Sequence, residues 1–171
     1  MSLQDEEHIM ISYNWENLQE VMIIKEALEE KGYRIGMELR HEEGSIAWAM
    51  TEGVDNSSAV LLCVSKAYKD SVNCNKEASY ADSRRKNIVP LKLDETVDLD
   101  GWISHMVEGR RCYDFYDFKY FKESVDGLDK ELVSLGVQKQ GNIYSANVGQ
   151  HKYIGDPDKI LKTKETYKKK T

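Results

Sequence analysis

Short apolar runs alternate with stretches of helical periodicity along most of the chain. A short continuous apolar run is typical of a strand covered on both faces, whereas apolar residues recurring every three or four positions indicate an amphipathic helix. The run from Ala59 to Val64 is apolar throughout and is the clearest strand. The predicted strands are residues 9–11, 33–37, 59–64, 88–91 and about 112–113.

Helical patterns fill the intervals between the predicted strands. The first is predicted to end at Lys31-Gly32, where glycine suits the position after a helix, and Ser45 is a plausible N-cap of the second. Residues 65–73 are predicted to form a turn, and Pro90 argues against a central place for the fourth strand because proline donates no hydrogen bond. The predicted helices are about 18–31, 46 onward, a stretch through 77–81, and about 117–135.

This regular alternation of strand and helix predicts an α/β fold. Strands joined through helices run parallel, and the helices then cover both faces of the sheet. We therefore expect a flavodoxin-like three-layer sandwich with a five-stranded parallel sheet in the order 2-1-3-4-5.

The charge of the chain is divided unevenly. It carries 24 basic and 30 acidic residues for a net charge of −6, yet residues 138–171 hold eight lysines and three acids, a net of +5. Residues 1–137 therefore carry −11, so the acidic body and the basic tail look like different objects. The net charge of −6 argues against a general nucleic-acid binder. We expect residues 1–6 to be a leader or residues added in cloning, 7–137 to form the domain, and 138–171 to be a polar, lysine-rich linker or tail.

Membrane and secreted classes find little support in the sequence. The longest apolar run, residues 59–64, is far shorter than the roughly 18 residues that a membrane helix needs, and the amino terminus lacks the pattern of a signal peptide. The three cysteines, Cys63, Cys74 and Cys112, have no paired spacing, which suits a reducing compartment. We expect a cytoplasmic protein with no direct membrane insertion.

Ligands of such a sheet bind beyond the carboxyl ends of its strands, where the strand order reverses. Residues 12–15 follow the first strand and residues 65–77 follow the third, so both segments would line that cleft. Neither a G-x-G-x-x-G nor a P-loop motif occurs there, and the acids of a response-regulator receiver are absent. The four histidines are scattered and indicate no metal site. Cys74 admits two interpretations, a core residue or a thiol activated by a helix N-terminus.

Several segments, in chain order, resemble the sequence boxes of Toll/interleukin-1 receptor (TIR) domains. The resemblance covers residues 7–137 and implies the fold expected above. Asn73, Gly36 and Glu38 depart from the family pattern, which more often has tryptophan, an aromatic residue and aspartate at these places. The resembling segments are 8–13 (HIMISY), 32–45 with its Gly-Ser pair, 65–77 ending in C-x-x-E, 100–103 with Gly-Trp, and 113–116.

The family that this chain resembles is divided in function. Some TIR domains are adaptors or receptor modules that associate with other TIR domains, and others cleave NAD⁺ to nicotinamide and ADP-ribose or a cyclic product. Glu77 matches the glutamate on which the enzymes depend. The resemblance therefore implies a catalytic Glu77, NAD⁺ as substrate with no bound cofactor, and innate-immune-type signalling activated by self-assembly. The alternative is a non-enzymatic module that signals by homotypic association.

A single carboxylate suits this reaction on physical grounds. Breaking the bond between nicotinamide and ribose leaves positive charge on the ribose, and the pyridinium needs no proton to leave. A charge pair at about 4 Å and an effective dielectric near 20 is worth about 4 kcal/mol, or roughly a thousandfold in rate. Spacing alone favours the simpler interpretation, in which Glu77 is a solvated helix acid that pairs with Arg84 or a neighbouring lysine.

The resemblance suggests further site residues, each with a simpler structural alternative. Trp15 also suits a buried place before the first helix, Ser45 and Asn73 suit helix capping, and Trp48 suits packing. Expected partners are NAD⁺ and other TIR domains, in a homo-oligomer or filament on activation. The substrate-binding candidates are Ser12, Tyr13, Asn14, Trp15, Glu38, Gly44, Ser45 and Asn73, and the self-association candidates are Arg40, His41, Glu42, Glu43 and Trp48.

Overall fold

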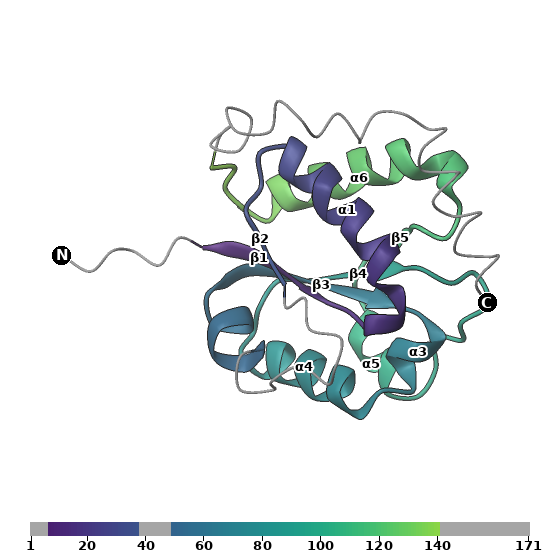
Figure 1. Cartoon of the computed structure of the whole chain (residues 1–171). Helices are drawn as coiled ribbons and strands as arrows, with labels where there is room; N and C mark the ends of the chain where they lie inside the picture. The colour runs from purple at the N-terminus through teal and green to yellow at the C-terminus, as the bar shows by residue number, and fades with distance from the viewer. Residues whose placement is uncertain (1–6, 38–48, 141–171) are drawn as a thin grey trace.

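The computed structural model describes residues 7–37 and 49–140, which form a parallel sheet between two layers of helices (Figure 1). The sheet has five strands in the order β2-β1-β3-β4-β5, and every pairing is parallel. This confirms the predicted fold class and strand order. The strands are β1 His8–Ser12, β2 Ile35–Gly36, β3 Ser57–Val64, β4 Ile88–Lys92 and β5 Tyr113–Asp114.

Helices lie on both faces of the sheet. Helices α1 and α6 cover one face, and α3, α4 and α5 cover the other (Figure 1). Short 3₁₀ turns precede α1 and α6, and a π-helical turn precedes β3. The bounds are Trp15–Asn17 and α1 Leu18–Glu30, Ala49–Val54, α3 Lys66–Lys69, α4 Val72–Ser83, α5 Trp102–Val107, Phe118–Tyr120 and α6 Phe121–Ser134.

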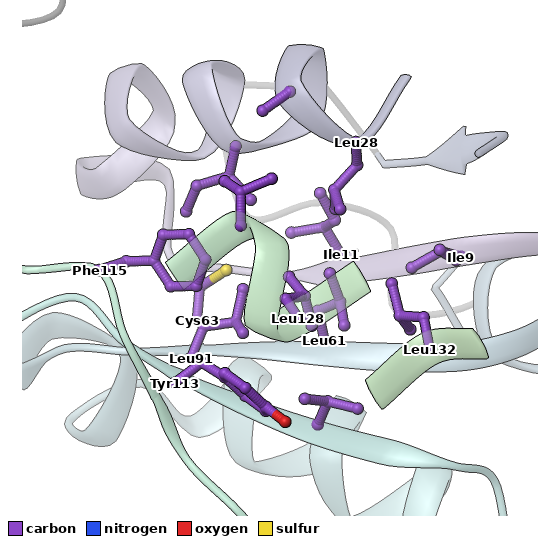
Figure 2. Close-up of a cluster of buried hydrophobic side chains, with 14 of the residues drawn as sticks. Ile9, Ile11, Leu28, Leu61, Cys63, Leu91, Tyr113, Phe115, Leu128 and Leu132 are labelled. Carbon is purple, nitrogen blue, oxygen red and sulfur yellow. The ribbon is translucent and has the colours of Figure 1, made fainter. Parts of the chain in front are cut away.

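Alternation along the central strands divides the core into two halves. Successive side chains of a strand point to opposite faces of the sheet. Ile9 and Ile11 of β1 therefore join the half under α1 and α6, whereas Met10 joins the half under α3, α4 and α5. Figure 2 shows the first half, where Leu28 of α1 and Leu128 of α6 lie over the sheet. Ser12, which follows Ile11 and ends β1, lies on the same face of the sheet as Met10.

The end of α1 follows the prediction, but β2 is shorter than expected. Gly32 has φ +100° and its amide donates to Glu29 O at 2.9 Å, while the amide of Tyr33 donates to Leu28 O at 3.1 Å. These bonds form the glycine-terminated helix end that the sequence predicts. The predicted strand 33–37 shrinks to two residues, because Tyr33 turns into the core and donates its hydroxyl to Asp129 Oδ1 at 2.6 Å.

Pro90 lies in an interior strand, contrary to the expectation from its missing N–H. Even-numbered residues of β4 turn their backbone groups toward β5, since the amide of Phe115 donates to Lys92 O at 2.8 Å. The ladder between these strands begins only at Leu91 and Tyr113. Pro90 precedes the first paired residue on the side of β5, so no hydrogen bond to β5 requires its N–H. Strand β4 can therefore lie between β3 and β5.

Residues 138–140, predicted to begin the tail, are held to the body. The amide of Gln140 donates to Gly32 O and its side chain to Glu7 O, both at 2.9 Å. Lys139 pairs with Asp129 at 3.0 Å. The remaining predicted leader and tail, 1–6 and 141–171, lie outside the described residues. In the described parts of the chain, no helix has the length and apolar character that crossing a membrane requires.

Candidate functional site

Glu77 lies at the carboxyl end of the sheet, beside the last residue of β1. The hydroxyl of Ser12 donates to Glu77 Oε2 at 2.7 Å, although the two residues are 65 positions apart. Ser12 is 1% exposed and Glu77 is half-buried. The carboxyl edge of a parallel sheet is where this topology places ligands, so the structure sets a carboxylate at the expected location.

A second hydroxyl reaches Ser12 from α3. The oxygens of Tyr68 and Ser12 are 2.8 Å apart, and both residues are buried. Because Ser12 gives its only hydroxyl proton to Glu77, the Tyr68 hydroxyl must be the donor to Ser12. Burial raises the pKa of Tyr68 well above its usual value, and the nearby Cys74 and Glu77 raise it further, so the phenol keeps its proton. The result is a chain of two hydrogen bonds that ends on the carboxylate.

Two serines start the helices that carry these side chains. Ser65 accepts a hydrogen bond from the amide of Tyr68 at 3.1 Å, and Ser71 accepts one from the amide of Cys74 at 3.2 Å. Both are N-caps, a role that serine favours. The predicted turn at 65–73 therefore contains α3 and the first turn of α4, because capping serines begin two helices within it.

The rotation of α4 directs the side chain of Glu77 toward Ser12. Its buried residues, Cys74, Ala78 and Ala81, follow helical spacing, and Glu77 lies directly beside that stripe. Arg84, the partner that spacing offered for Glu77, instead pairs with Asp55 at 3.1 Å. The other partner that the sequence offered for Glu77, a neighbouring lysine, stays a prediction.

Trp102 and Lys69 brace the short helix that carries Tyr68. The indole of Trp102 donates to Lys69 O at 2.9 Å, and its ring lies 5.8 Å from the ring of Tyr68. The ammonium of Lys69 donates to Asp98 O at 2.9 Å and also pairs with Asp100. The Gly-Trp segment of the sequence thus packs against the helix that carries Tyr68 and contacts the ring of Tyr68.

The residues after β1 point in different directions. Tyr13 packs against the core half under α1 and α6, on the face opposite to Ser12. Asn14 accepts from the amide of Glu16 at 3.0 Å and donates to Ala67 O at 3.4 Å, which ties β1 to α3. Trp15 is 53% exposed, so the interpretation of this residue as a buried anchor is wrong.

Asn73 and Cys74 lie in the first turn of α4. Asn73 is half-buried and is not the N-cap, because Ser71 occupies that position; the capping interpretation of Asn73 is wrong. Cys74 is buried, and burial raises the pKa of its thiol to about 12. The thiol is a core group, and its burial opposes activation by the helix N-terminus. Within residues 7–37 and 49–140, no three metal-ligating side chains converge on one point.

Several predicted site residues cannot be placed because they lie outside the described residues. They all fall in 38–48: Glu38, Gly44 and Ser45 among the substrate candidates, and Arg40, His41, Glu42, Glu43 and Trp48 among the self-association candidates.

Sequence reasoning missed Tyr68 and Trp102 as parts of this site. Tyr68 follows Ser65 by three positions, the spacing of an N-cap and the residue whose amide it accepts, and this pattern could have placed Tyr68 on a helix. No local signal indicates that its hydroxyl meets β1, since Ser12 and Tyr68 are 56 positions apart.

Comparisons with known proteins agree with the fold and the motifs. The TIR domain family profile matches residues 9–131. The TIR domain of the Toll-related receptor TRR-2 from Hydra magnipapillata superposes with a TM-score of 0.58 at 16% identity, over 73% of this chain and 97% of that one. The TIR domains of the activated Roq1 resistosome, which recognises the pathogen effector XopQ, give 0.48 at 19% identity, over 94% and 98%. No curated protein sequence matches. With its profile match spanning most of the described residues, this chain belongs to the TIR domain family.

Proposed function

We propose that this TIR domain cleaves NAD⁺ between nicotinamide and ribose, with Glu77 as the catalytic carboxylate. The observation that carries the proposal is the place of Glu77: its Oε2 lies 2.7 Å from Ser12 Oγ, at the carboxyl edge of the sheet. A half-buried carboxylate held at a ligand-binding edge suits a reaction in which positive charge develops on the substrate.

The chemistry requires little from the protein besides charge and orientation. The bond between the ribose carbon and the pyridinium nitrogen breaks, and its electron pair leaves with neutral nicotinamide. The carboxylate of Glu77 stabilises the cationic ribose, as carboxylates do in other glycosidic cleavages. Water then adds to the ribose carbon and loses a proton to give ADP-ribose, or a nitrogen of the adenine adds to give a cyclic product.

Other residues at this edge supply candidate contacts to the dinucleotide. Trp15 exposes its ring beside β1, and Asn14 lies between the strand end and α3. Asn73, in the first turn of α4, is one turn of helix from Glu77. We assign these three residues to substrate binding. We assign activation to self-assembly of TIR domains in a cytoplasmic, innate-immune-type signalling role, as the family membership suggests.

The test is nicotinamide release from NAD⁺, followed by chromatography over a series of protein concentrations. Turnover that rises more steeply than the protein concentration supports both cleavage and activation by assembly. Glu77→Gln should reduce turnover by roughly a thousandfold, the value of a charge pair at about 4 Å. Glu123→Gln, an exposed acid on α6, is the matched control and should retain full activity.

The outcome also separates the enzyme from a pure association module. Near-normal turnover by Glu77→Gln would contradict the role of Glu77. No turnover by the wild-type protein at any concentration would contradict cleavage and would favour a module that signals by homotypic TIR association.

A further inference from the structure

The two hydroxyls beside Glu77 form a directed pair in the half of the core under α3, α4 and α5. Ser12 Oγ is 2.7 Å from Glu77 Oε2 and 2.8 Å from Tyr68 Oη. With a carboxylate at one end, only one direction of donation satisfies both bonds, from Tyr68 to Ser12 to Glu77. Hydrogen bonds arranged in one direction polarise and strengthen one another in a low-dielectric interior.

Packing alone does not require these hydroxyls. Ser12 shares its face of β1 with Met10, and Tyr68 lies in the same core half as Val64 and Val60, so this surrounding is apolar. A polar group in such a place costs free energy unless it is hydrogen-bonded. Both hydroxyls are nevertheless buried. Tyr68 donates to Ser12, and Ser12 donates to one carboxylate oxygen of Glu77.

The helix that carries Tyr68 is held rigidly from outside. Helix α3 has four residues, too few to be stable without tertiary contacts. Its carbonyl at Lys69 accepts from the Trp102 indole, and its start is capped by Ser65, which in turn donates to Asn17 Oδ1 at 2.7 Å. A helix fixed at both ends in this way can hold the Tyr68 hydroxyl, and the side chain that it contacts, within a narrow range of positions.

We propose that Ser12 and Tyr68 are positioning residues that hold the carboxylate of Glu77 in its catalytic orientation. The inference rests on the proposed cleavage of NAD⁺, and it gives Ser12 a different role from the substrate contact suggested by the sequence. Ser12 acts on Glu77 from the buried side, since it is 1% exposed and its proton is given to that carboxylate.

The kinetic test compares Ser12→Ala and Tyr68→Phe with the wild-type protein. Each variant removes one oxygen and should lower kcat by roughly ten- to a hundredfold, because a small displacement of a catalytic group costs rate steeply. KM for NAD⁺ should stay within about twofold, because neither hydroxyl touches the substrate. Tyr80→Phe is the matched control: its hydroxyl also contacts a carboxylate, that of Asp55, from the same helix as Glu77. It should leave kcat unchanged.

A kcat within about twofold of wild type in both variants would overturn the inference, as would a raised KM at constant kcat, which is the signature of a substrate contact. Crystal structures of the two variants supply a readout that does not depend on turnover. The inference requires the Glu77 carboxylate to move or to adopt several conformers in them, and an unchanged carboxylate would overturn it. If the wild-type protein itself releases no nicotinamide, the proposed function fails, and the crystal structures alone decide whether Ser12 and Tyr68 hold Glu77.

Discussion

The imidazole of His8 fills the space that a side chain at Gly36 would need. A Cβ built on Gly36 would lie 2.4 Å from His8 Cδ2 and 2.6 Å from His8 Nε2, closer than real contacts allow. The two residues are on neighbouring strands, β1 and β2. This explains why the chain has glycine at position 36: the ring of His8, on the adjacent strand, occupies the space that any larger residue would need.

Gly36→Ala is therefore expected to destabilise the fold by about 1–3 kcal/mol, the usual cost of overpacking. Urea denaturation measures the change in the free energy of unfolding. In the His8→Ala background, the same Gly36→Ala substitution should cost much less, because the ring it meets is gone. Equal costs in the two backgrounds would show that the contact is not the cause.

His8 should also make stability depend on pH. Its pKa lies below the usual 6.5, chiefly because burial penalises the charged ring, and Arg34 and Lys86 lower it further. A hydrogen bond with the Gly53 backbone and the charge of Glu52 oppose this. The unfolded chain therefore takes up a proton more readily than the folded chain, so the free energy of unfolding should fall as pH drops below about 6.5.

The variant that isolates this effect is His8→Gln, which should flatten the fall in melting temperature between pH 7 and pH 5. His105→Gln, which replaces an exposed histidine of α5, is the control and should keep the wild-type slope. A wild-type slope in His8→Gln would mean that other groups set the acid sensitivity.

The three cysteines should differ in reactivity. Burial raises the pKa of Cys63 well above its usual value and that of Cys74 to about 12, whereas Cys112 is partly exposed with a more modest rise. Timed alkylation of the native protein, read by mass spectrometry, should modify Cys112 first. Cys63 and Cys74 should react at a comparable rate only in urea. Fast native labelling of Cys74 would contradict its assignment to the core.

Trp102→Phe should cost about 1–2 kcal/mol of stability. The change keeps an aromatic ring near Tyr68 but removes the indole N–H that donates to Lys69 O at 2.9 Å, leaving that carbonyl without this donor. Trp15→Phe is the matched control, because the exposed ring of Trp15 should tolerate the same substitution with little change. Equal effects of the two substitutions in urea denaturation would argue against a bracing role for Trp102.

Trp15→Ala should weaken NAD⁺ binding without destabilising the fold. A stacked ring and base are worth about 1–3 kcal/mol, so KM should rise roughly tenfold, while the melting temperature should hardly change because the ring is 53% exposed. Tyr120→Ala removes an equally exposed ring from the 3₁₀ turn after β5, the edge strand three places from β1 in the sheet, and should leave KM unchanged. An unaltered KM in Trp15→Ala would remove Trp15 from the substrate site.

Periodicity was sufficient for the architecture because each of its signals is local. The continuous apolar run of β3 reflects a strand covered on both faces, and Gly32 marks the end of α1 through its own backbone conformation. Strand limits were less predictable, since Tyr33 has a strand-like neighbourhood but turns into the core to reach Asp129. Pro90 was misjudged because the side on which a strand pairs depends on where its neighbour begins.

The candidate site was likewise predictable only where its signal is local. The motif ending at Glu77 is contained in thirteen consecutive residues, 65–77, so the sequence was enough to single out this acid and to indicate the family. Its orientation depends on Ser12 and Tyr68, which lie 65 and 56 positions apart from their partners in the hydrogen-bonded chain. Those contacts follow from the alternation of β1, the rotation of α4 and the bracing of α3 by Trp102. Each is a property of packing between distant segments, and no local pattern of residues encodes it.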